Sequence, residues 1–121
     1  LSGLYDPAER KHGIHAGEME TSVMLHLHEG LVAMDEADNF VPISVAMEES
    51  GAVLTPEGLV GFGWQAQDLH PSGACGNAAA ADAGRGAETV ERAASALVRL
   101  CREVSDYPIE QVTQKTVYNT P

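Results

Sequence analysis

Apolar residues recur at helical spacing shortly after the start of the chain. Met19, Val23 and Leu27 are four residues apart, so a helix over residues 18–28 presents all three on one face. The first turn of this segment is acidic, which suits the positive end of a helix dipole. Gly30 follows and is a typical stop signal. The pattern therefore predicts an amphipathic helix that ends just before Gly30.

A second and longer apolar stripe lies nearer the end of the sequence. It predicts a helix from about Ala78, or somewhat later, to Val104, with Gly84 and Gly86 weakening its beginning. The apolar positions recur at intervals of three and four and are Val90, Ala94, Leu97, Cys101 and Val104. The supporting ion pairs expected along this helix are Glu88–Arg92 and Arg99–Glu103.

The segments around these helices carry weaker patterns. Residues 1–14 mix turn formers with charges and are expected to form a loop, whereas the glycine- and proline-rich residues 51–77 are expected to be irregular, with short strands. In residues 40–47 apolar side chains occupy every second position, which predicts a strand. Pro42 favours an edge or the start of that strand because proline lacks an N–H. No repeat or linker divides the chain, so residues 1–121 are expected to belong to one domain.

Composition narrows the class of protein. Hydrophobic residues make up 44% of the 121, which is enough for a packed core. The net charge of -11 argues against nucleic acid or an anionic membrane surface as a partner, because both attract clustered Lys and Arg. No apolar run approaches the roughly 20 residues of a membrane span. With two cysteines and no signal-peptide pattern, a reduced, cytoplasmic protein is expected. Leu1 in first place indicates a processed product, an expression product or a piece of a longer protein.

Candidate chemistry concentrates where the first helix begins. His15 precedes that helix, and Glu20, one turn into it, can reach back toward the imidazole. A carboxylate that holds an imidazole fixes its tautomer, which suits a general acid. Ala16 and Gly17 leave room for a ligand, and free N–H groups at the helix start can hold an anionic oxygen. The alternative is a surface histidine followed by two ordinary first-turn carboxylates, Glu18 and Glu20, and spacing alone favours this alternative.

The other candidate residues give weaker signals. His26 and His28 are two apart, so on a helix they point in different directions and cannot share one metal ion. His12, in a charged segment, is expected in solvent. His70 lies on a turn-rich loop that either borders a ligand site or merely connects two elements. Cys75 has no obvious histidine partner in the sequence and is therefore not expected to be a nucleophile.

Three stretches of the sequence resemble the creatininase family, the creatinine amidohydrolases and their relatives. The most specific is GIHAGEMETSVMLHL, residues 13–27, in which a histidine and small residues precede Glu-Thr-Ser and a Met/Leu-rich helix; LVAMDEA follows at residues 31–37. GWQAQDLHPSGACGNAAAADAGRG and AETVERAASALVRLCREV resemble the family's later glycine-rich turn and its closing helix. The resemblance covers most of residues 10–105.

This resemblance implies a three-layer α/β/α fold with a mainly parallel sheet. It also implies a hydrolase that acts on amide bonds, often cyclic ones, with divalent metal ions such as zinc, manganese or iron. By position, His15 matches the histidine that gives a proton to the leaving nitrogen, and Glu20 matches the glutamate that supports the site and orients that histidine. Glu18 falls where the family varies and receives no fixed role. Glu18 and Trp64, which begins the loop 64–77, are candidates for substrate contact.

The resemblance extends over only about half of the family's length. Most of the family's metal ligands lie in a Glu-x-His segment with a following Asp and in an Asn-Gly-His-type segment, and neither occurs in these 121 residues. The chain is therefore interpreted as the C-terminal half of a creatininase-like amidohydrolase in a higher oligomer, with a companion chain or segment holding the metal. The alternatives are a related hydrolase of formamides, peptides or oxidised sugar rings, and a non-catalytic subunit that completes the fold of a partner chain.

Overall fold

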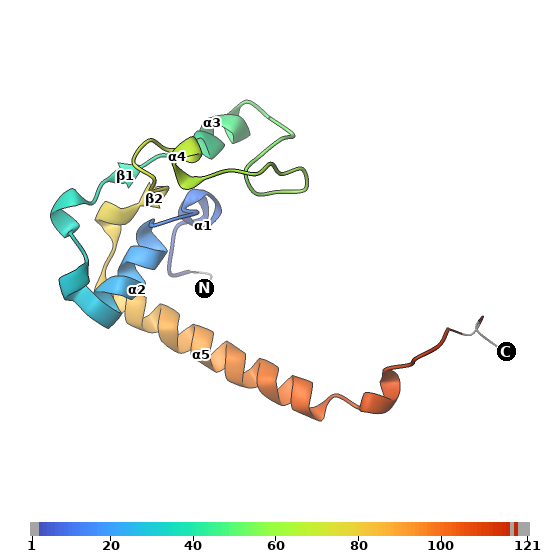
Figure 1. Cartoon of the computed structure of the whole chain (residues 1–121). Helices are drawn as coiled ribbons and strands as arrows, with labels where there is room; N and C mark the ends of the chain where they lie inside the picture. Colours follow the sequence, from blue (N-terminus) through green and yellow to red (C-terminus); the bar gives the residue numbers. More distant parts are fainter. Residues whose placement is uncertain (1–2, 117, 119–121) are drawn as a thin grey trace.

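Short helices and one long helix dominate the computed structural model, which describes residues 3–116 and residue 118 (Figure 1). The helices are α1 (Pro7–His12), α2 (Glu18–His28), α3 (Ile43–Glu49), α4 (Ala66–Leu69) and α5 (Ala83–Asp106). The two strands are β1 (Asn39–Phe40) and β2 (Gly76–Asn77). Single turns of 3-10 helix lie at Glu29–Leu31, Met34–Glu36, Ala78–Ala80 and Ile109–Gln111.

Part of the segment before His15 is helical, so the expectation of a loop over residues 1–14 is wrong for residues 7–12. Asp6 caps α1, because its carboxylate accepts a hydrogen bond from the Ala8 N–H at 2.7 Å. Pro7 occupies the first helical position, where its missing N–H costs nothing and its fixed φ suits a helix. These two residues start a helix of one and a half turns that ends at His12.

The two helices predicted from the apolar periodicity are confirmed. α2 spans Glu18–His28 and passes into a 3-10 turn at the position of Gly30. α5 begins at Ala83, where the carboxylate of Asp82 accepts from the N–H of Arg85 at 2.9 Å and caps the helix. Both ion pairs expected along α5 are formed, Glu88–Arg92 and Arg99–Glu103.

The strand predicted for residues 40–47 is wrong in most of its length. β1 ends at Phe40, Pro42 takes the N-cap position, and the chain then turns into α3. Ser44 and Glu48 are four residues apart, so a helix brings both to the same face, where both contact His12 on α1. This tertiary contact explains why an alternating apolar pattern forms a helix here.

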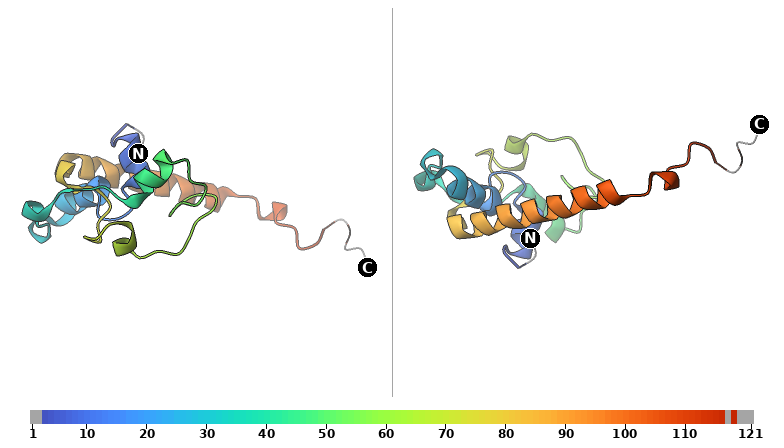
Figure 2. Two further views of the ribbon diagram at one scale, coloured as in Figure 1. Left: turned by 90° about the horizontal axis from the view of Figure 1, so that it is seen from above. Right: turned by 90° about the horizontal axis from the view of Figure 1, so that it is seen from below.

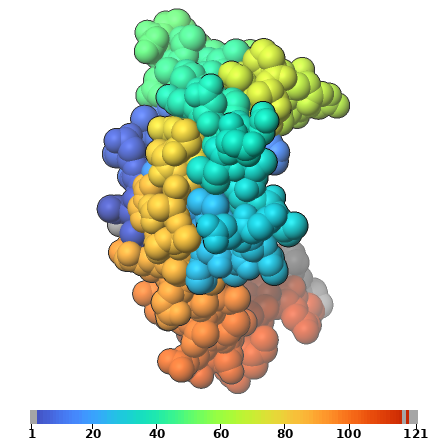
Figure 3. Space-filling view, turned by 90° about the vertical axis from the view of Figure 1, so that its left-hand side faces the viewer, coloured from blue at the N-terminus to red at the C-terminus, as the bar shows by residue number. Residues whose placement is uncertain are grey.

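α2 and the first turns of α5 pack side by side (Figure 3). Gly86 makes this close approach possible, because a Cβ at this position would clash with the backbone carbonyl of Ser22 on α2. Tyr5 is buried against the same part of α5, and its hydroxyl lies 2.8 Å from Thr89 Oγ1. The guanidinium of Arg85 lies over the Tyr5 ring, 5.3 Å from its centroid.

The sheet found among the described residues is a single antiparallel pair. Asn39 pairs with Asn77 and Phe40 with Gly76, and an isolated bridge between His15 and Cys75 continues the same region. The parallel sheet of a three-layer fold does not occur within residues 3–116. The buried apolar residues of this part of the chain are Tyr5, Leu69, Cys75 and Ala78. Such a core is small for a chain of 121 residues.

The C-terminal half of α5 projects beyond the other elements (Figure 2). Its apolar stripe therefore lies open: Leu97 is 59% exposed and Val104 is 67% exposed. Leu27 on the predicted apolar face of α2 is also exposed. None of the described helices has the length and apolar character required to cross a membrane.

Candidate active site

His15 and Glu20 are brought together at the start of α2. His15 lies in the turn between α1 and α2, and its Nδ1 atom is 3.7 Å from Glu20 Oε2, a distance for an ion pair rather than a hydrogen bond. The same carboxylate oxygen accepts from the N–H of Ala16 at 2.5 Å. The side chains of His15 and Glu20 are 56% and 58% exposed. Glu20 thus reaches back across the helix start, and the imidazole stays open to a ligand.

Two backbone hydrogen bonds hold His15 in place, whereas its imidazole has only the ion pair with Glu20. The N–H of Cys75 donates to the carbonyl of His15 at 2.7 Å, and the N–H of His15 donates to the carbonyl of Cys75 at 3.4 Å. Ala16 has a φ of 52°, which is rare for a residue with a side chain. Such a conformation persists where the surrounding contacts enforce it. The turn around His15 is therefore built for one backbone conformation.

The free N–H groups expected at the start of α2 are partly occupied by the chain itself. The N–H of Ala16 binds Glu20, and the N–H of Glu18 donates to Glu9 Oε1 at 2.7 Å. The expectation that these groups wait for an anionic ligand is therefore wrong for these two donors. Glu9 is a site residue that sequence reasoning missed, because its second contact is the N–H of Asn77, far along the chain.

The two residues expected to contact substrate have other partners. Glu18 is buried and forms an ion pair with Arg85, which also binds Asp82. The Asp82 carboxylate, followed by Glu18, raises the pKa of Arg85, and Arg85 in turn lowers the pKa of Asp82. Glu18 therefore ties α2 to α5. The indole N–H of Trp64 donates to the Pro56 carbonyl at 3.1 Å, which holds the side chain against its own loop.

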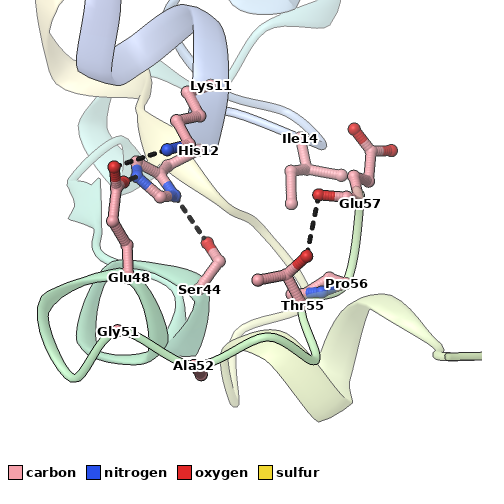
Figure 4. Close-up of a pocket in the computed structure, with 10 residues that line it drawn as sticks. All are labelled: Lys11, His12, Ile14, Ser44, Glu48, Gly51, Ala52, Thr55, Pro56 and Glu57. Carbon is pink, nitrogen blue, oxygen red and sulfur yellow. Dashed lines mark hydrogen bonds and ion pairs between the residues drawn. The ribbon is translucent and has the colours of Figure 1, made fainter. Parts of the chain in front are cut away.

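His12 is buried, so its expected place in solvent is wrong. Its Nδ1 lies 2.9 Å from Ser44 Oγ and its Nε2 lies 2.6 Å from Glu48 Oε2, so one imidazole holds two residues of one face of α3 (Figure 4). Lys11, followed by His12, lowers the pKa of Glu48 through hydrogen bonds to its carboxylate. A hollow of about 200 Å³ opens beside this contact and extends to Ile14. The i,i+4 spacing of Ser44 and Glu48 is a sequence signal from which this contact could have been expected, had residues 43–49 been read as a helix.

The Cys75 thiol and the side chains of His26, His28 and His70 have no hydrogen bond to the His15 imidazole among the described contacts, although the Cys75 backbone is paired with His15. Burial raises the pKa of the Cys75 thiol, which makes it a poor nucleophile. His70 lies 2.7 Å from Ser72 Oγ through Nδ1 and meets the Phe40 ring edge-on at 5.6 Å. His26 and His28 are exposed on α2.

The described residues do not provide a complete metal site. Nowhere in residues 3–116 do three or more His, Cys, Asp or Glu side chains gather closely enough to hold a metal ion. By themselves, His15 and Glu20 can hold and transfer a proton at an open surface.

Comparison with known proteins places these residues in a family. The family model of creatinine amidohydrolase, the creatininase family, matches residues 2–101. The chain belongs to the creatininase family. Membership suggests an α/β fold and a hydrolase of the metal-dependent amidohydrolase type. No curated protein and no solved structure gave a significant match to this creatininase-family chain.

Proposed function

We propose that this chain is the C-terminal half of a metal-dependent amidohydrolase and that His15 is its general acid. The observation that carries the proposal is the pairing of His15 with Glu20, 3.7 Å apart, inside the segment that the creatininase family model covers. Because Glu20 lies beside Nδ1, the Nε2 atom is left to face the substrate. When the amide C–N bond breaks, Nε2–H gives its proton to the departing nitrogen.

The rest of the site is proposed to come from a companion chain or segment. This companion carries the ligands of the divalent ions. Its helices and strands complete a three-layer α/β/α fold with a mainly parallel sheet. The small buried core and the exposed stripe on α5 support the proposal, because an open apolar face gains free energy when a partner covers it. A cyclic amide is the preferred substrate class; formamides, peptides and oxidised sugar rings are the other candidates.

Replacing His15 tests the general acid. The substrate is creatinine, or whichever cyclic amide or formamide the assembled enzyme hydrolyses fastest. His15→Ala is expected to lower the turnover of this substrate by about 10²-fold or more. For an amide whose leaving nitrogen carries a nitroaryl group, the same substitution should lower turnover much less. A weakly basic leaving nitrogen needs little help from a proton donor. Steady-state kinetics with both substrates measures the difference.

His26→Ala is the matched control, since His26 lies exposed on α2, the helix that follows the His15 turn. Its turnover should equal that of the unchanged enzyme. If correctly folded His15→Ala turns over substrate as fast as the unchanged enzyme, His15 is not the general acid. If turnover falls by the same factor with both substrates, His15 acts in another way.

A second candidate function is that of a non-catalytic subunit. The more than half exposed side chain of His15 favours it, because a catalytic group is usually enclosed when the site is complete. The two functions differ in what surrounds His15 in the assembled protein. A structure of the assembly with His15 within about one water of a bound metal favours catalysis, and one with His15 in bulk solvent favours the structural subunit.

A further inference from the structure

The carboxylate of Glu9 joins the two segments that carry the His15 turn. Its Oε1 accepts from the N–H of Glu18 at 2.7 Å, and its Oε2 accepts from the N–H of Asn77 at 2.9 Å. Glu18 is the first residue of α2, and Asn77 is the last residue of β2. A single side chain on α1 therefore connects parts of the chain that are far apart in sequence.

These two N–H groups lie just beyond the bridge between His15 and Cys75. Glu18 follows His15 closely in the sequence, and Asn77 follows Cys75 closely. The two carbonyls and N–H groups of the bridge are themselves paired, at 2.7 and 3.4 Å. Glu9 thus holds the segments on both sides of the bridge, while the imidazole of His15 remains exposed.

Three glycines surround the Glu9 carboxylate. A Cβ on Gly13, Gly17 or Gly76 would clash with Glu9 Oε1. These glycines come from the turn before His15, from the turn after it and from the strand opposite. The carboxylate therefore fits into a space that only residues without side chains leave open. Its negative charge also suits the N-terminus of α2, where the helix dipole is positive.

We propose that Glu9 is a positioning residue for His15. It holds the His15 turn against Cys75 and so sets the direction in which the imidazole points, without touching the substrate. The consequence for catalysis rests on the function proposed above, whereas the hold on the turn does not.

Hydrogen exchange tests that hold directly. The protein is purified with the chains that accompany it, and exchange is followed in peptides covering residues 13–18 and 72–77. In Glu9→Ala these peptides should exchange about tenfold faster or more, because two hydrogen bonds to a charged group are lost. Peptides from α5 beyond residue 90 should not change. Arg10→Ala, an exposed neighbour on α1, is the matched control and should leave all of them unchanged.

Small molecules separate a positioning role from a general loss of stability. Glu9→Ala leaves a glycine-walled space with two N–H donors, which formate fits by size and charge. Formate should restore slow exchange and the turnover number, whereas neutral formamide should not. Glu9→Gln keeps the shape of the side chain but presents an NH₂ group to one of the two N–H donors. Its kcat should fall with little change in KM. This variant serves as the test if Glu9→Ala does not fold.

Each outcome decides between the ideas. Unchanged hydrogen exchange in Glu9→Ala overturns the proposal. It is also overturned if His15→Ala disables the enzyme while Glu9→Ala, despite faster exchange, keeps an unchanged kcat. Loss of kcat that formate restores supports it. If His15→Ala leaves kcat unchanged, the proposed general acid is wrong, and the exchange rates alone then decide whether Glu9 holds the turn.

Discussion

His12 and His15 are three residues apart and meet opposite surroundings. His12 ends α1 and is buried between Ser44 and Glu48, so both of its ring nitrogens have partners. His15 lies in the next turn, with Glu20 near one nitrogen and the other nitrogen open. A histidine with both nitrogens bound stabilises a fold, whereas one with a free nitrogen can exchange protons with a ligand.

The charge of Glu48 gives a prediction about pH. Lys11, followed by His12, lowers the pKa of Glu48 below its ordinary value of 4.5. A lowered carboxyl pKa contributes stability that is fully present above the ordinary, unfolded value and is lost as the pH falls through the folded pKa. The carboxyl carbon signal of Glu48 should therefore titrate below 4.5 by NMR.

Lys11→Ala should move this titration up toward the ordinary value. The difference in melting temperature between the unchanged protein and Glu48→Gln should be largest near neutral pH and should fade in acid. A Glu48 signal that titrates at 4.5 or above would contradict the structure.

Local sequence predicted one of these two environments. Glu20 is five residues from His15 and lies in the first turn of α2, which His15 shortly precedes, so their approach follows from spacing. Ser44 and Glu48 lie more than thirty residues from His12, and Asn77 lies 68 residues from Glu9. Contacts of this length depend on how elements pack, which short-range periodicity does not specify.

Elements differ in how strongly their own residues determine them. α2 and α5 carry apolar residues at helical spacing, α5 also has a capping residue in Asp82, and both helices were predicted nearly to their ends. The segment that forms α3 has apolar residues at every second position, yet Ile43 and Met47 are also four apart, so it is compatible with either structure. The contact with His12 selects the helix. The large sheet that the family resemblance implies has no counterpart in the described residues.

The crossing of α2 and α5 gives a prediction at this scale. Gly86→Ala places a Cβ against the Ser22 carbonyl, so the two helices must move apart. Overpacking of this kind is expected to cost about 1–3 kcal/mol of stability. Urea unfolding of the assembled protein measures it.

Gly84→Ala is the matched control on the same helix. A Cβ at Gly84 approaches only the Asp82 carboxylate, at 3.1 Å, which has to move by only a few tenths of an ångström, and alanine favours a helix by up to about 1 kcal/mol over glycine. This variant should be as stable as the unchanged protein or more so. A Gly86→Ala variant of unchanged stability would show that the helices do not approach this closely.

At the scale of the whole molecule, apolar surface exceeds what the chain can bury by itself. Few apolar side chains are buried among the described residues, whereas the stripe along α5 remains open. An antiparallel pair of two-residue strands offers no sheet face on which α5 could pack. This open apolar surface is the observation behind the proposed companion chain or segment.

Production of the chain alone tests this dependence. The isolated 121 residues are expected to be insoluble or loosely folded, and co-production with a companion carrying the Glu-x-His segment should restore a soluble assembly. The interface should bury well over about 2,000 Å², the range of permanent complexes. Calorimetry and intact mass spectrometry measure folding and composition. A sharp melting transition from an isolated monomer would contradict the expectation.

The contact between Tyr5 and Thr89 also sets an order in time. The two side chains are 84 residues apart in the sequence, and the main helix–helix contact of α2 is with the first turns of α5. During synthesis, Tyr5 and α2 therefore leave the ribosome well before the surface of α5 that they contact. Contacts between distant residues form late because a long loop must close first. The nascent chain has to remain protected from aggregation until its last long helix emerges.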